Sequence, residues 1–78
     1  MTTVLKYIIG VDKKPIVFSR EIQHSDLGHV AISAGFSIIN YDSNHRKFKV
    51  KCYGESSSLH IISNPTIDEK IIESFLNS

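Results

Sequence analysis

The sequence predicts an α+β fold, with a mainly antiparallel, twisted sheet of five strands packed against one C-terminal helix. Three observations indicate this fold. Ile and Ser are abundant whereas Ala is nearly absent, which favours strands over helices along most of the chain. Apolar and polar residues alternate with a period of two in several segments. From Thr66 onwards the apolar residues instead recur at helical spacing.

The length of 78 residues indicates one small domain, spanning 1–78. A chain of this size buries only about 60% of the surface that its unfolded form exposes. Because it has one cysteine, no internal disulfide can stabilise it, so the core or an oligomer must do so. Apolar residues at 41% and charged residues at 22% are typical of a globular rather than a disordered chain.

The first two strands are expected at residues 3–9 and 16–22, where apolar and polar side chains alternate. Residues 10–15 between them are rich in turn-forming types. Because the link is short, we expect these two strands to form a hairpin.

The central strands are expected at 31–41 and 47–53, joined by a polar hairpin loop at 42–46. Residues 47–53 give the clearest alternation in the chain. Gly35 lies inside the preceding strand and predicts a bulge or the close approach of another backbone. A short fifth strand is expected at 59–62, and the small residues leave open a partial barrel.

The C-terminal helix is predicted to follow Asn64 and Pro65, which interrupt the fifth strand. Thr66 and Glu69 have the spacing of a capping box, in which each side chain accepts a hydrogen bond from an orphan amide. Five apolar residues then form one stripe that needs a sheet to cover it. They are Ile67, Ile71, Ile72, Phe75 and Leu76.

Two segments, 23–29 and 52–58, collect polar side chains between the expected strands, and a polar site would be sought there first. The first segment lacks strand alternation and predicts a single helical turn, capped by Ser25 or Asp26. Glu55 in the second segment is expected to pair with His24 or His29 and so tie the two segments together.

A metal site is the most specific chemistry that the first of these segments suggests. Imidazole and carboxylate side chains suit zinc, and His24, Asp26 and His29 could ligate it together with Glu55 or His60. The spacing is not a standard zinc pattern, so an interpretation as capping and loop residues is favoured.

Enzymatic activity and cofactor binding are not expected. The chain has no nucleophile elbow and no recognisable triad, so the serine run 56–58 is interpreted as a turn whose hydroxyls bond local backbone. Cys52 shares its parity with Phe48 and Val50, which predicts a buried thiol rather than a reactive one.

A basic ladder runs along the fourth expected strand. It could hold a phosphate backbone, or it could simply be a solvated face whose lysines protect an edge strand. The interaction candidates are Arg46, Lys47, Lys49, Lys51 and Tyr53 in this ladder, with Glu55 beyond it.

The function expected from the sequence is that of a small, non-enzymatic protein-interaction or regulatory module of bacterial or phage type. The net charge of +1 gives no overall basic field, and free sheet edges could bind a partner protein or a second copy in a homodimer. One alternative is a nucleic-acid-binding domain that uses the basic strand 46–51. The other is a small metal- or ligand-binding protein that uses the segment 24–29.

The compartment expected from the sequence is the cytoplasm, without a membrane partner. The first ten residues lack the features of a signal peptide, and no apolar run approaches the roughly 18 residues that span a bilayer. A single thiol also favours a reducing compartment.

Overall fold

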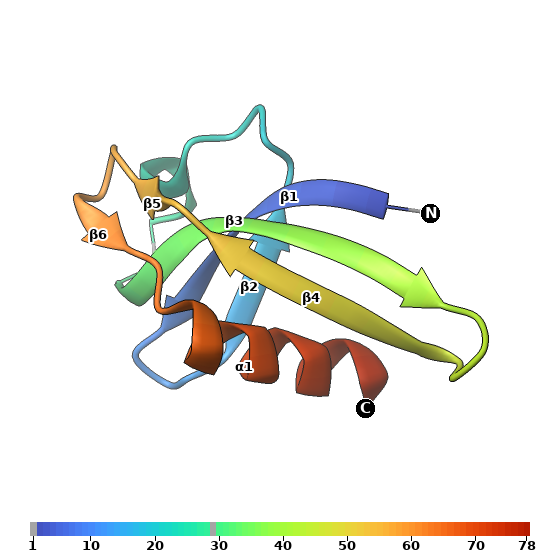
Figure 1. Cartoon of the computed structure of the whole chain (residues 1–78). Coiled ribbons are helices and arrows are strands. Elements are labelled where there is room, and N and C mark those ends of the chain that lie inside the picture. The colour runs from blue at the N-terminus through green and yellow to red at the C-terminus, as the bar shows by residue number, and fades with distance from the viewer. Residues whose placement is uncertain (1, 29) are drawn as a thin grey trace.

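The computed structural model describes residues 2–28 and 30–78 and confirms the α+β class (Figure 1). A four-stranded antiparallel sheet has the order β2-β1-β3-β4, a separate two-stranded sheet pairs β5 with β6, and α1 packs on β4. The elements are β1 (Thr2–Gly10), β2 (Pro15–Phe18), η1 (His24–Leu27), β3 (Ala31–Asp42), β4 (Lys47–Tyr53), β5 (Glu55–Ser56), β6 (Ile61–Ile62) and α1 (Pro65–Asn77).

The predicted hairpin of the first two strands is present, but β2 is shorter than expected. It ends at Phe18, and residues 19–22 form a turn instead. Ser19 explains the early end, because its backbone oxygen accepts from the Ile22 amide at 3.1 Å and its hydroxyl accepts from the Glu21 amide at 3.2 Å. These local bonds compete with the sheet ladder.

The central hairpin of β3 and β4 agrees with the prediction, and of the two alternatives predicted at Gly35 the close approach of another backbone is the one found there, whereas a bulge lies three residues earlier. Ile9 pairs with Ser33 but Gly10 pairs with Ala31, so one extra residue of β3 forms a bulge. A Cβ on Gly35 would lie 2.6 Å from the Tyr53 backbone oxygen, so another backbone does come close there.

The expected fifth strand does not join the main sheet. Only Ile61–Ile62 is extended, and it pairs with Glu55–Ser56 in the small second sheet. His60 has a φ of 56° and sits in the turn that joins β5 to β6, so 59 and 60 cannot continue the strand. The prediction of five strands in one sheet was therefore wrong, and the sheet does not close into a barrel, because β2 and β4 remain its two edges.

The helix α1 begins one residue before the predicted cap. Asn64 is its N-cap and Pro65 occupies the first turn, where the missing amide of proline costs nothing. The Asn64 amide donates to the Asp68 carboxylate at 2.8 Å. Glu69, predicted to cap the helix with Thr66, instead accepts the Cys52 amide of β4 at 2.8 Å.

The hydrophobic core lies between α1 and one face of the main sheet. It contains Tyr7, Ile9, Val50, Cys52 and Ile72. Ile71 and Leu76 of the predicted stripe pack against this cluster, but Ile67 and Phe75 are 54% and 58% exposed. The stripe is only partly covered because α1 lies along the edge strand β4 rather than across the middle of the sheet (Figure 1).

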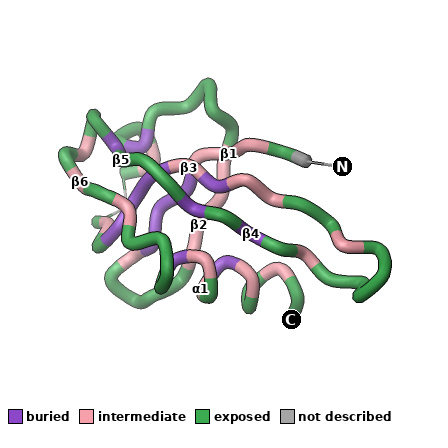
Figure 2. The backbone as a smooth tube through the Cα atoms, in the orientation of Figure 1, coloured by how far each residue is buried: buried purple, intermediate pink, exposed green. Residues whose placement is uncertain are grey.

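The opposite face of the main sheet is covered at one end only. There η1 and the β5–β6 sheet lie over it, and Ile8 and Ala34 are fully buried. Further along the same face Val4 and Ile38 are half-buried and Lys51 is exposed. Figure 2 shows the same gradient, with buried backbone near η1 and mostly exposed backbone towards the β3–β4 turn. Among the described residues, no helix is long and apolar enough to cross a membrane.

Candidate functional site

The two polar segments singled out from the sequence meet around one cleft. It has a volume of about 450 Å³ and lies where η1 and β5 approach the open face of the sheet. Its lining combines an ammonium group, a carboxylate, a phenyl ring, an imidazole ring, and amide and hydroxyl groups. The lining residues are Lys6, Gln23, His24, Phe36, Glu55, Ser57 and Ser58.

The helical turn η1 forms one wall of the cleft. The Asp26 amide donates to the Gln23 backbone oxygen at 3.0 Å, and the Gln23 amide donates to the Asp26 carboxylate at 3.3 Å. The turn ends at Gly28, which has a φ of 66°. The predicted single turn is therefore confirmed, but Gln23 is its N-cap in place of Ser25 or Asp26.

His24 is held inside the wall of the cleft. Its side chain is 3% exposed, and its Nε2 atom lies 3.0 Å from the Gly35 backbone oxygen. The ring packs edge-on against Phe18 and Phe36, with centroid distances of 5.3 and 6.1 Å. This environment is that of a packed core histidine that ties η1 to β3.

The serine run 56–58 has the predicted local bonding role at Ser56, whereas Ser58 bonds a distant segment. The Ser56 hydroxyl is buried and accepts the Leu59 amide at 3.2 Å. The Ser58 hydroxyl accepts the Ser25 amide at 3.2 Å, which joins the two walls of the cleft. This bond provides the tie between the two segments that the sequence assigned to Glu55.

Glu55 forms no ion pair within the described part of the chain, so its predicted pairing with His24 was wrong. The alternative pairing with His29 lies outside the described residues. Glu55 is exposed and adds a carboxylate to the cleft. The cation of the cleft, the Lys6 ammonium, instead donates to the Ile22 backbone oxygen at 2.8 Å.

The proposed metal ligands do not form a cluster over the residues described. No group of three His, Cys, Asp or Glu side chains in 2–28 and 30–78 is placed to hold a metal ion. His24 points to Gly35, whereas Asp26 is exposed and bonds the Gln23 amide. The third candidate, His29, lies outside the described residues.

The basic ladder lies on the uncovered face of the sheet, opposite the helix. Lys47, Lys49, Lys51 and Tyr53 are exposed, and they alternate with the inward-facing residues of β4, as predicted. The preceding cation, Arg46, sits in the β3–β4 turn with a φ of 53°.

An aromatic stack lies on this face, and one carboxylate offsets part of its positive charge. Tyr53 stacks on Phe36 with a centroid distance of 5.6 Å and an interplanar angle of 22°. Asp42 lies 3.9 Å from the Lys49 ammonium and 2.7 Å from His45 Nδ1. The hydrogen bond from His45 lowers the pKa of Asp42, so this carboxylate stays charged and offsets part of the ladder.

Cys52 is a core thiol, as its parity predicted. It is 6% exposed, and burial raises its pKa to about 12. Because the thiolate is the reactive form, this environment keeps Cys52 unreactive near neutral pH.

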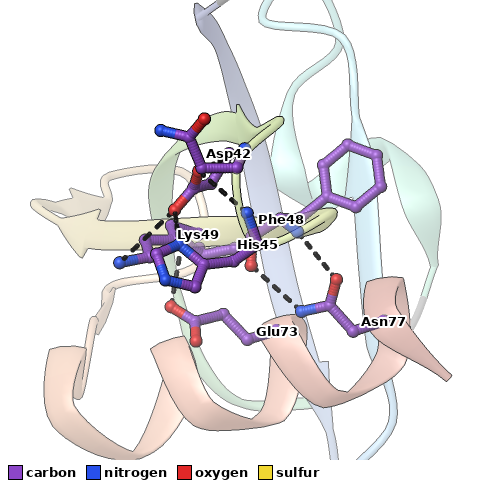
Figure 3. A network of polar contacts seen from close by, with 8 residues as sticks. Asp42, His45, Phe48, Lys49, Glu73 and Asn77 are labelled. Atoms are coloured by element: carbon purple, nitrogen blue, oxygen red, sulfur yellow. Dashed lines mark hydrogen bonds and ion pairs between the residues drawn. The ribbon is translucent and has the colours of Figure 1, made fainter.

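The two edges of the main sheet differ sharply, although the sequence predicts free sheet edges. At the β4 edge, the outward amides of Cys52 and Val50 donate to Glu69 and Glu73 at 2.8 and 2.9 Å. The Phe48 amide donates to Asn77 at 2.7 Å, and the Asn77 amide donates back to the Phe48 oxygen at 3.0 Å (Figure 3). We call the side chains of Glu69, Glu73 and Asn77 together the edge seal.

The other edge is only half covered. β2 pairs with residues 6–9 of β1, and no strand pairs with residues 2–5 on that side in the described structure. The Gly10 amide donates to the Lys14 oxygen, and the Gly10 oxygen accepts from the Lys13 amide. Both backbone groups of Gly10 therefore point to the β2 side. Because backbone groups alternate along a strand, those of Val4 point to the same side. The first half of β1 therefore presents a free strand edge.

Sequence reasoning missed the edge seal, although a signal for it exists. Glu69, Glu73 and Asn77 recur every four residues, which places them in one line along a helix. These three residues flank the apolar stripe of the helix, but no sequence pattern predicts that they face a strand edge rather than water.

Comparison with protein-family models, with curated proteins and with solved structures finds no match to this chain.

Proposed function

We propose that this chain is a non-enzymatic protein-interaction module that binds an extended segment of a partner protein along the free edge of β1. The observation that carries the proposal is the uncovered edge of residues 2–5, on the opposite side of the sheet from the sealed β4 edge. An unpaired edge is a template for another strand, because its amides and carbonyls lack partners. The buried, unreactive Cys52 also suits a protein that works in the reducing cytoplasm.

The chemistry beside this edge indicates the kind of segment that fits. By strand alternation Val4 lies on the open face, next to Ile38 of β3, with which it pairs. Thr3 and Leu5 lie on the helix side. A bound strand would place one apolar side chain beside Val4, and the backbone would supply most of the affinity.

Replacing Val4 by proline tests this mode of binding. The Val4 amide points away from β3, so proline removes an edge donor without breaking the β1–β3 ladder. We expect partner capture from a lysate of the source cells, measured by quantitative mass spectrometry, to fall several-fold, up to about tenfold, the effect of losing one hydrogen bond. Circular dichroism should show an unchanged fold.

Val11→Pro is the matched control, because Val11 is exposed in the turn closed by the Lys13 amide and the Gly10 oxygen, where proline fits. It should capture the partner as well as the wild type does. Equal capture by Val4→Pro and wild type would rule out pairing at this edge.

A second candidate function is the binding of single-stranded nucleic acid on the open face. The Phe36–Tyr53 stack, beside Lys49 and Lys51, favours it. Exposed aromatic rings next to lysines are the usual platform for unpaired bases and their phosphates. The Asp42 carboxylate and the overall charge of +1 weaken this candidate.

The double change Lys49→Gln and Lys51→Gln tests the second candidate. If nucleic acid binds there, the affinity for a fluorescent oligonucleotide, followed by anisotropy, should fall about tenfold. The slope of log affinity against log salt concentration should also become shallower, by the equivalent of about two phosphate contacts. Lys14→Gln with Lys70→Gln, two exposed lysines away from this face, is the control of equal charge. No binding by the wild type at low salt would eliminate this function.

A further inference from the structure

The edge seal reproduces the spacing of a neighbouring strand. Every second residue of β4 directs its backbone groups outward, a repeat of about 6.7 Å. Every fourth residue of a helix rises by about 6.0 Å along its axis. Glu69, Glu73 and Asn77 can therefore meet three successive outward amides of β4 in step, and the bond lengths of 2.7 to 2.9 Å show that they do.

Asn77 imitates a strand most closely. Its carboxamide accepts from the Phe48 amide and donates to the Phe48 oxygen, as a peptide group of an antiparallel strand would (Figure 3). Glu69 and Glu73 can only accept, and as carboxylates they form the stronger, charge-assisted type of bond. The outward amides of β4 are thus occupied along most of the strand.

We propose that the edge seal keeps this chain from pairing through β4 with a second copy of itself. Without the seal, the β4 edge would be a long, regular strand edge of the kind that joins protein copies. A second copy fits it because the outward residues are self-complementary about a twofold axis at Val50. In that arrangement Val50 faces Val50 of the second copy, and Phe48 faces its Cys52.

The basic ladder adds a second barrier to the same pairing. About the twofold axis, Lys49 would face Lys51 of the second copy on the open side of the sheet, and like charges directly opposite one another repel. Salt screens this repulsion between exposed lysines. Self-pairing of an unsealed chain should therefore become stronger at high salt, the opposite of nucleic-acid binding.

The triple variant Glu69→Ala, Glu73→Ala, Asn77→Ala tests the proposal. By analytical ultracentrifugation we expect a dimer population well above that of the wild type, larger at about 0.5 M than at about 0.05 M salt as the Debye length shrinks from roughly 14 to 4 Å. A folded triple variant that associates no more than the wild type at either salt concentration would overturn the proposal.

Two control variants separate the hydrogen bonds from the charge. Glu69→Gln with Glu73→Gln keeps an acceptor oxygen at each position and should stay like the wild type. Glu21→Ala with Glu55→Ala removes the same charge from exposed positions outside the seal and should also stay like the wild type. Dimerisation of either control to the extent of the triple variant would refute the role of the hydrogen bonds.

Amide exchange in the wild type keeps the proposal testable if the triple variant fails to fold. The Val50 and Cys52 amides sit on an outer edge, yet the seal should slow their exchange at least about tenfold relative to an open edge. Exchange as fast as that of an unprotected surface amide would show that the seal is not formed in solution, and would overturn the proposal.

Discussion

Replacing Asp68 by alanine is expected to unfold most of the protein under ordinary conditions. The Asp68 carboxylate is 1% exposed and accepts three hydrogen bonds, from the Tyr7 hydroxyl at 2.6 Å, the Ser33 hydroxyl at 2.7 Å and the Asn64 amide at 2.8 Å. Each donor left without a partner costs about 1–3 kcal/mol. Three such losses sum to about 3–9 kcal/mol, a range that reaches and exceeds the whole stability of a small domain, about 5 kcal/mol.

Urea unfolding followed by circular dichroism measures this loss. Asp68→Asn is the matched variant, because it preserves the shape and one acceptor oxygen and should cost about 1–2 kcal/mol. Tyr7→Phe and Ser33→Ala remove one donor each and leave the carboxylate its other partners, so each should cost about 1 kcal/mol. An Asp68→Ala variant with the urea midpoint of the wild type would contradict this account.

The Asp68 network has a structural role that reaches the candidate binding surfaces. It joins the start of α1 to β1 through Tyr7 and to β3 through Ser33. Burial and the bond to Asp68 raise the pKa of Tyr7, so its hydroxyl remains a donor throughout the neutral range. Because α1 is fixed at this end, Glu69 and Glu73 are held beside the β4 edge.

The sequence was sufficient for the elements whose side-chain pattern is set by one buried face. β4 alternates cleanly, and the apolar stripe of α1 is dense, so local pattern and tertiary packing agree there. It failed where short-range hydrogen bonds decided the outcome. The Ser19 turn shortened β2, and the turn at His60 kept the last strand out of the main sheet.

The candidate site was predicted in position but not in its bonding. The two polar segments do meet, because η1 and β5 both lie over the same end of the sheet. The polar atoms that pair between the two segments are decided by distances in the folded chain, which residue spacing in the sequence does not predict. Ser25 and Ser58 form the link, while His24 turns inward to Gly35.

Gly35→Ala is expected to cost about 2–3 kcal/mol, although alanine is ordinarily tolerated in a strand. The added Cβ would lie 2.6 Å from the Tyr53 oxygen and 3.1 Å from the Ser63 Cβ. Neither neighbour can move freely, because the next residue, Gly54, accepts two bonds from Ser63, at 2.6 and 3.1 Å. Relieving the clash must therefore shift the β5–β6 sheet, which carries one wall of the cleft.

Gly28→Ala provides the comparison, and urea unfolding of both variants makes the measurement. Gly28 has a φ of +66° and open space around its Cβ, so alanine there meets only the backbone cost of the left-handed region, about 1 kcal/mol. We expect Gly35→Ala to lose clearly more stability than Gly28→Ala, and to shift the NMR signals of His24, whose Nε2 faces the Gly35 oxygen. Equal losses with an unmoved His24 would mean that β3 and Tyr53 are not in close contact. The missing side chain at Gly35 is what allows the Tyr53 oxygen and Ser63 to lie this close to β3.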